Sequence, residues 1–202
     1  MADPLLAVND LQLERGGRVL LDNFSLQVSA GELVQVEGAN GAGKTTLLRS
    51  LAGLSELGQQ GGVVRHCEQM LYLGHKPGIK QLLTASENLA WFCHTYGIAT
   101  AGIDQALARV GLDGYQDVQC QSMSAGQQRR VSLARLYLSE ADLWLLDEPF
   151  TAIDRAGVAA LTQTLLERVQ AGGAIIFTSH QELAVDFPLR RVVLGTQAGA
   201  QA

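Results

Sequence analysis

The sequence predicts an α/β fold in which helices cover both faces of a parallel β-sheet. A glycine-rich segment at 38–45 stands between an alternating, strand-like pattern and a helical pattern. Two runs, 143–147 and 174–178, are apolar on both faces and are separated by one helical pattern, as is typical of neighbouring parallel strands. The length of 202 residues fits one compact domain, or one domain with an inserted subdomain.

Composition excludes several classes of protein. The net charge is −5 and no run of like charges occurs, which argues against binding to nucleic acid or to anionic lipid. The charged fraction is 17% and the apolar fraction 47%, which excludes intrinsic disorder and favours a surface that meets another protein. No apolar stretch approaches the ~20 residues of a membrane-spanning helix. The first residues lack a basic and apolar secretion signal, so we expect a cytosolic protein.

Cysteine usage fits a reducing compartment. Cys67, Cys93 and Cys120 form an odd set without a CxxC pair. We expect three reduced thiols rather than metal or haem ligands.

Elements of the N-terminal half follow in order. Alternating residues predict strands at 11–13, 26–28 and 33–37. From Thr45 the period becomes helical, and that helix ends near Gly53. A second helix begins near Thr84, because Thr84 and Glu87 have the spacing of a capping box.

Helices and strands also alternate in the C-terminal half. We expect a short helix at 106–112 and a longer one at 125–138, with Ser124 as its N-cap. A strand at 143–147 is followed by a helix at 158–169, which Gly172 and Gly173 end. The last expected strands are 174–178 and 192–194.

The segment Gly38–Thr45 has the pattern GxxxxGK[ST] between a strand and a helix. Its glycines let successive amide groups converge on phosphate oxygens at the positive end of the helix dipole. Lys44 would reach the β and γ phosphates, and the Thr45 hydroxyl would ligate Mg²⁺. The alternative is a glycine turn that caps a helix, with a surface lysine. The candidate nucleotide-binding residues of this loop are Gly38, Ala39, Asn40, Gly41, Ala42, Gly43, Lys44, Thr45 and Thr46.

Two acidic residues and a histidine follow the buried strands. Asp147 ends the run at 143–147, and ligands of open parallel sheets bind beyond the carboxyl ends of strands, so Asp147 should lie beside Thr45 and hold the metal. Glu148 is then placed to orient or deprotonate the attacking water. His180 follows the next strand and would contact the γ phosphate. A solvent-facing acidic strand end and a structural histidine are the alternatives.

The segment 123–130 is a further candidate. Ser124 and the amides after it begin a helix, which makes an anion site. Ordinary helix capping is the simpler interpretation when the segment is considered alone.

Taken together, these motifs resemble the nucleotide-binding subunits of ABC transporters. The ordered set is a Walker A loop at 38–45, a signature at 124–127, a Walker B strand at 143–148, a D-loop at 151–154 and a switch histidine at 180. The resemblance implies a P-loop NTPase fold of the ABC ATPase type, with a RecA-like parallel sheet, an N-terminal antiparallel β portion and a helical subdomain. It also implies ATP and Mg²⁺ as cofactors, and a homodimer in which one copy's signature closes over the other copy's nucleotide.

The same resemblance implies roles for individual residues. The catalytic residues would be Lys44, Glu148 and His180. The metal site would use Thr45, Asp147 and, at the position where most relatives have glutamine, His75. The signature residues on the nucleotide would be Ser124, Gly126 and Gln127. Arg15 stands where relatives often place an aromatic ring against adenine, so its guanidinium is a candidate for that stacking. A solvated surface arginine is the alternative.

Segments 71–80 and 83–89 resemble the ATP-binding subunit of the haem exporter of bacterial cytochrome c maturation. That resemblance implies ATP hydrolysis coupled to haem export or to release of the haem carrier. It further implies an integral membrane subunit, other cytochrome c maturation proteins as partners, and a peripheral position on the cytoplasmic side of the inner membrane. The alternatives are another small ABC transporter, or an ATP-binding dimerisation or regulatory module with little hydrolysis.

The expected domain organisation is a single ABC ATPase domain over 1–202. Its nucleotide-binding core would comprise 1–75 and 139–202, with a helical insertion at 76–138. Within the insertion, Trp91, Phe92 and Tyr96 should pack into the helical core. The alternative is that part of the helix surface that carries these aromatic residues, together with the loop at 76–81, binds a membrane partner.

Overall fold

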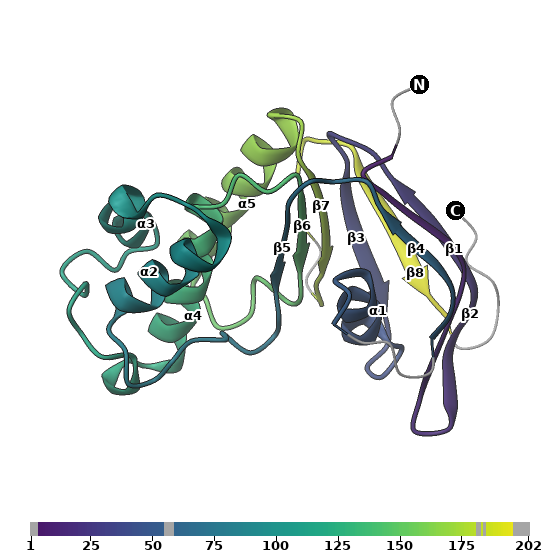
Figure 1. Cartoon of the computed structure of the whole chain (residues 1–202), viewed down its shortest axis with the longest axis horizontal. Helices are drawn as coiled ribbons and strands as arrows, with labels where there is room; N and C mark the ends of the chain where they lie inside the picture. Colours follow the sequence, from purple (N-terminus) through teal and green to yellow (C-terminus); the bar gives the residue numbers. More distant parts are fainter. Residues whose placement is uncertain (1–3, 55–58, 181–182, 184, 196–202) are drawn as a thin grey trace. The chain divides into compact units, whose positions relative to one another are not determined.

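A computed structural model of the chain describes residues 4–54, 59–180, 183 and 185–195 (Figure 1). The expectation that the chain lacks a secretion signal was based on its first residues, and Met1–Asp3 lie outside the described residues. The chain divides into two compact units. The first comprises Met1–His75, Ala141–Pro149 and Leu165–Ala202, and the second comprises Lys76–Glu140 and Phe150–Thr164.

The N-terminal part of the first unit is an antiparallel sheet of order β2-β1-β4. Strand β1 (Leu6–Arg15) pairs with β2 (Arg18–Val28) and with β4 (Gln59–Arg65). The β1–β2 turn consists of Gly16 and Gly17, both with positive φ, as tight hairpins require. The predicted strands at 11–13 and 26–28 are therefore parts of longer strands, and β4 was not predicted.

The remaining strands of the first unit form a parallel sheet of order β5-β6-β7-β3-β8. These strands are β5 (Met70–Leu73), β6 (Leu143–Leu146), β7 (Ala174–Thr178), β3 (Leu33–Gly38) and β8 (Leu189–Leu194). The predicted pairing of the two apolar runs is confirmed, because β6 and β7 are parallel neighbours. Their carboxyl ends meet at one edge, where the candidate site lies.

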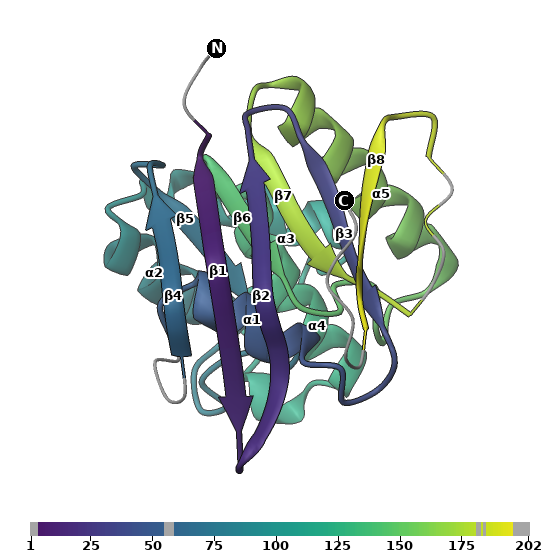
Figure 2. The same ribbon diagram turned by 90° about the vertical axis from the view of Figure 1, so that its right-hand side faces the viewer.

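Helix α1 (Lys44–Leu51) packs between the two sheets (Figure 2). Its Leu47, Leu48 and Leu51 share one buried cluster with β1 and β2 and with alternate residues of β3, β6 and β7. This packing fixes the start of α1 against the end of β3. Arg65 of β4 adds to it by donating hydrogen bonds to the carbonyls of Ser50 and Leu51 at the helix C-terminus, where orphan carbonyls favour a cation.

The second unit is helical. Its elements are α2 (Ala85–Tyr96), α3 (Ile103–Arg109), α4 (Ala125–Ala134), the first part of α5 (Arg155–Gln170), and the 3₁₀ turns η1 (Thr100–Gly102), η2 (Cys120–Ser122) and η3 (Arg135–Tyr137). Both expected N-caps are confirmed, since Thr84 and Ser124 each form a complete capping box.

The prediction of helix at 106–112 was wrong at its end, because Gly111 has φ +72° and the chain turns there.

The second unit also contains 150–164, whereas all of 139–202 was expected in the nucleotide-binding core. Two contacts explain the grouping. The Thr164 hydroxyl hydrogen-bonds to the Tyr137 hydroxyl at 3.0 Å, and Arg130 pairs with Asp154 at 2.5 Å. The D-loop and the beginning of α5 therefore pack with the signature helix α4.

Of the three aromatic residues of α2, only Phe92 is buried, with 3% of its surface exposed. Trp91 and Tyr96 are about half exposed, at 50% and 46%. The expectation that all three pack inward was therefore wrong for two of them. Successive helical residues point about 100° apart, so the burial of Phe92 does not by itself bury Trp91, which lies at the edge of the buried face of α2.

The three cysteines form no disulfide with one another. Cys67, Cys93 and Cys120 are free thiols, and burial raises the pKa of each of them. They therefore stay protonated and weakly nucleophilic at neutral pH. In the described part of the chain, no helix is both long enough and apolar enough to cross a membrane.

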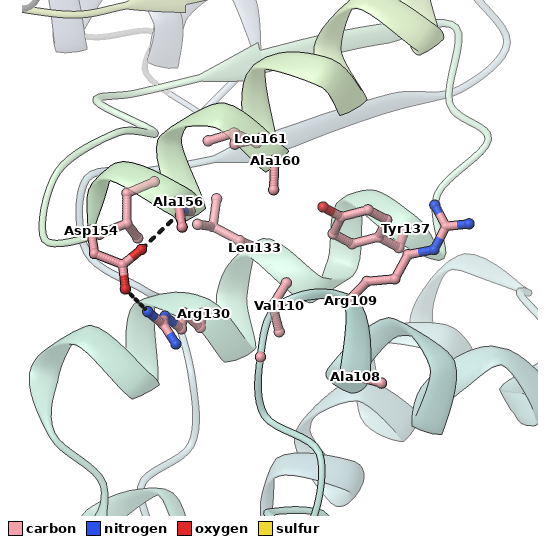
Figure 3. Close-up of a pocket in the computed structure, with 13 residues that line it drawn as sticks. Ala108, Arg109, Val110, Arg130, Leu133, Tyr137, Asp154, Ala156, Ala160 and Leu161 are labelled. Carbon is pink, nitrogen blue, oxygen red and sulfur yellow. Dashed lines mark hydrogen bonds and ion pairs between the residues drawn. The ribbon is translucent and has the colours of Figure 1, made fainter.

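A cavity of about 320 Å³ lies within the second unit, between α3, α4, η3 and α5 (Figure 3). Leu133, Tyr137 and Ala160 contribute apolar walls. The polar side chains at the cavity contact one another, since the Arg109 guanidinium lies 5.5 Å from the Tyr137 ring centroid and Arg130 pairs with Asp154.

Asp154 supports a prediction about stability and pH. Its carboxylate accepts a hydrogen bond from the Gly157 amide and contacts Arg130, and these interactions lower its pKa. A carboxyl group whose pKa is lower in the folded than in the unfolded state stabilises the fold at pH values above its unfolded-state pKa. This stabilisation is lost as the pH falls through the folded-state pKa. Asp154→Asn keeps a capping oxygen but removes the charge. Its thermal unfolding midpoint should be lower than wild type at neutral pH.

The same difference should shrink as the pH falls below about 4, where the unfolded-state Asp carboxyl becomes protonated. Thermal unfolding of both proteins across this range checks the prediction. A difference that stays constant with pH would show that the carboxylate charge of Asp154 does not contribute.

Candidate nucleotide-binding site

The glycine-rich loop connects the end of β3 to the start of α1. Gly38 has φ +149°, and a Cβ there would lie 2.8 Å from the Leu194 carbonyl oxygen, so a larger residue would displace β8. Gly43 has φ +99° and precedes α1 without a side-chain cap. The first amides of a helix have no acceptor within it. The loop and the helix start therefore present amide donors and a positive dipole end to an anion.

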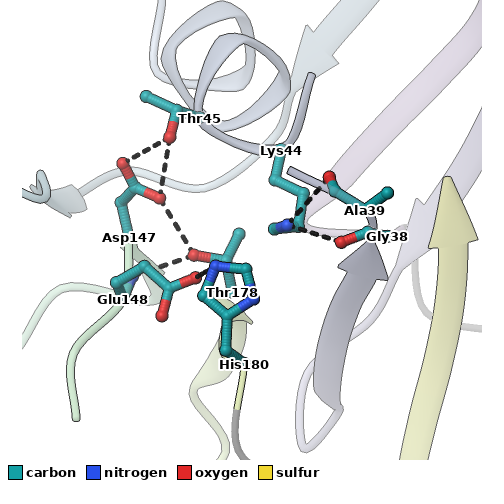
Figure 4. A network of polar contacts seen from close by, with 8 residues as sticks. All are labelled: Gly38, Ala39, Lys44, Thr45, Asp147, Glu148, Thr178 and His180. Atoms are coloured by element: carbon teal, nitrogen blue, oxygen red, sulfur yellow. Dashed lines mark hydrogen bonds and ion pairs between the residues drawn. The ribbon is translucent and has the colours of Figure 1, made fainter. Parts of the chain in front are cut away.

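Lys44, the first residue of α1, is only 8% exposed. Its Nζ donates hydrogen bonds to the carbonyl oxygens of Gly38 at 2.6 Å and of Ala39 at 3.3 Å. The ammonium group is thus held over the loop by the loop's own backbone (Figure 4).

Thr45 and Asp147 meet at the carboxyl edge of the parallel sheet, as the strand-end argument predicted. The Thr45 hydroxyl lies 3.1 and 2.9 Å from the two carboxylate oxygens of Asp147. Asp147 is 1% exposed, and the Thr178 hydroxyl donates a second hydrogen bond to it at 2.9 Å. Burial of a carboxylate is costly unless donors satisfy it, and these two hydroxyls contribute to that role.

Glu148 and His180 lie next to this pair (Figure 4). The His180 Nε2 is 3.3 Å from the Glu148 Oε1, and the Glu148 amide donates to the Thr178 hydroxyl at 2.8 Å. Glu148 has φ +51°, in the left-handed region that residues other than glycine seldom adopt. The backbone therefore turns sharply after Asp147, and Glu148 contacts the end of β7 rather than continuing β6.

A magnesium ion bound together with nucleotide phosphates fits this chemistry. Among the described residues, no group of three or more His, Cys, Asp or Glu side chains is arranged to hold a metal. Mg²⁺ bound to a nucleotide needs only one or two protein ligands, because phosphates and waters supply the others. Thr45 and Asp147 provide such a pair. His75 is exposed and lies two residues after β5, and its role as a metal ligand stays a prediction.

The signature residues belong to the second unit. The Ser124 hydroxyl accepts a hydrogen bond from the Gln127 amide, and the Gln127 Oε1 accepts one from the Ser124 amide. The Ser124 hydroxyl keeps its own proton for donation to another acceptor. At Gly126 a Cβ would lie 3.2 Å from the Ala152 carbonyl oxygen, so the signature and the D-loop are in close contact.

Thr178 is a site residue that was not predicted from the sequence. Its position after four apolar residues of a strand indicated only where that strand ends. The available signal was its register: β6 and β7 pair at Leu146 and Phe177, so the next residues, Asp147 and Thr178, lie side by side at the sheet edge.

The fold and the loop geometry define a P-loop nucleoside triphosphate-binding domain. The sequence matches the ABC transporter family over residues 21–151, and the chain belongs to that family of ATP-hydrolysing proteins. Two curated relatives carry the name cytochrome c biogenesis ATP-binding export protein CcmA. The protein from Hahella chejuensis is 48% identical, with 95% of this chain and 96% of the relative aligned. The protein from Vibrio cholerae is 47% identical, with 95% and 99% aligned.

Solved structures agree with this assignment. An ATP-binding subunit of an ABC transporter superposes with a TM-score of 0.79 at 26% identity, covering 87% of this chain and 79% of that one. A putative ABC transporter ATP-binding protein from Pyrococcus furiosus gives a TM-score of 0.77 at 25% identity, covering 92% and 96%. The α/β P-loop fold predicted from the sequence is thereby confirmed.

Proposed function

We propose that this chain is the ATP-hydrolysing subunit of a membrane transporter complex that acts in cytochrome c maturation. The observation that carries the hydrolytic role is the contact network in which Thr45 and Asp147 adjoin Glu148 and His180 beside the phosphate-binding loop. The names of the curated relatives support the role in cytochrome c maturation. The transported group would be haem, or the step driven would be release of the haem carrier.

Binding of ATP begins with the loop at 38–45. Its amides and the N-terminus of α1 bind the phosphates, and Lys44 moves from the Gly38 and Ala39 carbonyls to the β and γ phosphates. Thr45 and Asp147 would hold Mg²⁺, which when bound neutralises charge on the β and γ phosphates. Because Asp147 is buried and hydrogen-bonded, its carboxylate is already oriented before nucleotide arrives.

Hydrolysis requires a base close to the γ phosphate. Glu148 accepts a proton from the water that attacks the γ phosphorus, the bond from that phosphorus to the bridging oxygen breaks, and ADP leaves. His180 lies 3.3 Å from the Glu148 carboxylate and would orient it while donating to the γ phosphate.

Ser124, Gly126 and Gln127 would contact the nucleotide bound by a second copy of the chain. The start of α4 supplies backbone amides, and the Ser124 hydroxyl retains a proton for a phosphate oxygen. A symmetric dimer formed on ATP binding, with two shared sites, is the arrangement that uses these groups.

An exposed surface of the second unit is proposed to bind the integral membrane subunit, which would hold the chain at the cytoplasmic face of the inner membrane. Leu82 is 72% exposed, and Trp91 is half exposed with the Lys80 ammonium 4.7 Å from its ring centroid. Exposed large apolar side chains of this kind are typical of interface anchors. Asn88 makes the neighbouring loop rigid by accepting from the Lys80 amide and donating to the carbonyls of Lys80 and Leu83.

Replacing both Leu82 and Trp91 with alanine should raise the dissociation constant for the membrane subunit about 30-fold. This factor corresponds to a loss of about 2 kcal/mol of binding free energy, the effect of removing one hot-spot residue. Co-purification from membranes and a titration of the detergent-solubilised partner measure this effect. Val193→Ala is the matched control, because Val193 is an exposed apolar residue of β8 in the other unit. Equal association of the double variant and wild type would exclude this surface.

Deletion of the gene tests the proposed function as a whole. We expect specific loss of c-type cytochromes, restored by the wild-type chain but not by Glu148→Gln. A normal content of c-type cytochromes would instead point to the motor of another small transporter. Phosphate release measured with and without the membrane subunit separates an ATPase from a regulatory module, because the module would be inactive in both states.

A further inference from the structure

Thr178 lies at the centre of the contact network, at the carboxyl end of β7. Its side chain is fully buried, with 0% of its surface exposed. Its hydroxyl lies 2.9 Å from the Asp147 Oδ1 and 2.8 Å from the Glu148 amide nitrogen (Figure 4). One hydroxyl group therefore bridges the side chain of the proposed metal ligand and the backbone of the proposed base.

The direction of both hydrogen bonds follows from the chemistry of the groups. An ionised carboxylate can only accept, so the Thr178 hydroxyl donates its single proton to Asp147. A backbone amide can only donate, so the same oxygen accepts from Glu148. These two hydrogen bonds hold the Thr178 hydroxyl in one orientation, and they restrain the Asp147 carboxylate and the Glu148 amide in turn.

This bridge matters most for Glu148, whose backbone has φ +51°. Residues other than glycine seldom adopt this conformation, and where they do the surrounding structure maintains it. The bond from the Glu148 amide to Thr178 is a tertiary contact of that kind. The orientation of this peptide sets the direction of the Glu148 Cα–Cβ bond, and hence where its carboxylate lies.

We propose that Thr178 is a positioning residue for ATP hydrolysis, which holds Glu148 in its left-handed conformation and ties its backbone amide to the Asp147 carboxylate. The inference rests on the proposed function, because it assigns Thr178 to the same reaction. Valine matches threonine in shape and lacks the hydroxyl, whereas serine keeps the hydroxyl and lacks the methyl group.

Thr178→Val should lower the kcat of ATP hydrolysis about 100-fold, the size of effect that a misplacement of about 1 Å produces. The dissociation constant of Mg-ATP should change less than about threefold, because the phosphate-binding loop is intact and the Thr45 hydroxyl still contacts both carboxylate oxygens of Asp147. Thr178→Ser should keep kcat within about threefold of wild type. These constants are to be measured on the complex with its membrane subunit. Thr162→Val is the matched control, because the Thr162 hydroxyl bonds to the Val158 carbonyl within helix α5.

A double-mutant cycle with Glu148→Gln identifies the residue through which Thr178 acts. If Thr178 positions Glu148, adding Thr178→Val to Glu148→Gln should lower kcat no further. The single variant Thr178→Val should also accumulate the ATP-bound dimer in sedimentation experiments, because bound ATP would turn over slowly. Losses that multiply in the double variant, or an equal loss of Mg-ATP binding and kcat, would overturn the proposal.

The pair Thr178→Ser and Thr178→Ala keeps the test decisive if the valine variant does not fold. Both lack the methyl group and differ only in the hydroxyl, so equal kcat values for this pair would refute the positioning role. Failure of the proposed function has a different signature: the wild-type complex itself would release no phosphate. The inference, which assigns Thr178 to that reaction, would then fall with it. Failure of the inference alone leaves the wild-type complex active and gives Thr178→Val the same kcat and the same amount of ATP-bound dimer as wild type.

Discussion

Replacing Glu148 with glutamine should stop ATP hydrolysis while ATP remains bound. Glutamine has nearly the same shape and keeps an oxygen near His180, but it cannot accept the proton of the attacking water. Loss of a general base lowers rates by about 10²–10⁴-fold. The contacts between Thr45 and Asp147 do not involve the Glu148 side chain, so the Mg-ATP site should persist.

The variant should also favour the closed dimer. If ATP joins the two copies and hydrolysis separates them, blocking the chemical step leaves the ATP-bound dimer as the stable species. Phosphate release in the presence of the membrane subunit and sedimentation with and without Mg-ATP give the two measurements. Glu68→Gln, on an exposed side chain, controls for loss of one negative charge. Unchanged turnover in Glu148→Gln would remove Glu148 from the role of base.

Sequence reasoning was most accurate where a motif fixes the backbone. The pattern from Gly38 to Thr45 requires a strand, a tight loop and a helix, and β3 and α1 occupy those positions. Asp147 was predicted to lie beside Thr45 because the carboxyl ends of parallel strands meet at a common edge of the sheet. Both features follow from topology alone, and the hydrogen bonds between Thr45 and Asp147 agree with this placement. The catalytic and metal-binding roles themselves stay predictions.

Features that depend on tertiary contacts were not predictable from local pattern. Strand β4 begins Gln-Gln-Gly-Gly and gains its place by pairing with β1, so its sequence carries no strand-like alternation. For Trp91 the local pattern predicted burial that does not occur: its aromatic side chain has helical spacing but remains half exposed. The role of Thr178 emerges only from the register between β6 and β7 and from the unusual φ of Glu148. Local propensity is a weak guide wherever a neighbouring strand decides the outcome.

Replacing Lys44 with alanine should weaken ATP binding and abolish turnover. The ammonium is held 2.6 Å from the Gly38 carbonyl oxygen and is almost fully buried, so it meets phosphate in a poorly hydrated site. A hydrogen bond to a charged group contributes about 1.5–3 kcal/mol, which corresponds to a dissociation constant about 10- to 150-fold larger. Hydrolysis should fall further than binding, because charge develops on the phosphates in the transition state.

Equilibrium ATP binding to the isolated chain and phosphate release by the complex measure the two losses separately. Lys76→Ala is a control that removes the same charge from an exposed position. Lys44→Arg should not restore activity, because the planar guanidinium does not replace a compact ammonium in a buried loop. If Lys44→Ala kept normal ATP affinity and normal turnover, residues 38–45 would be a helix cap with a buried lysine, and the phosphate-binding role of the loop would be wrong.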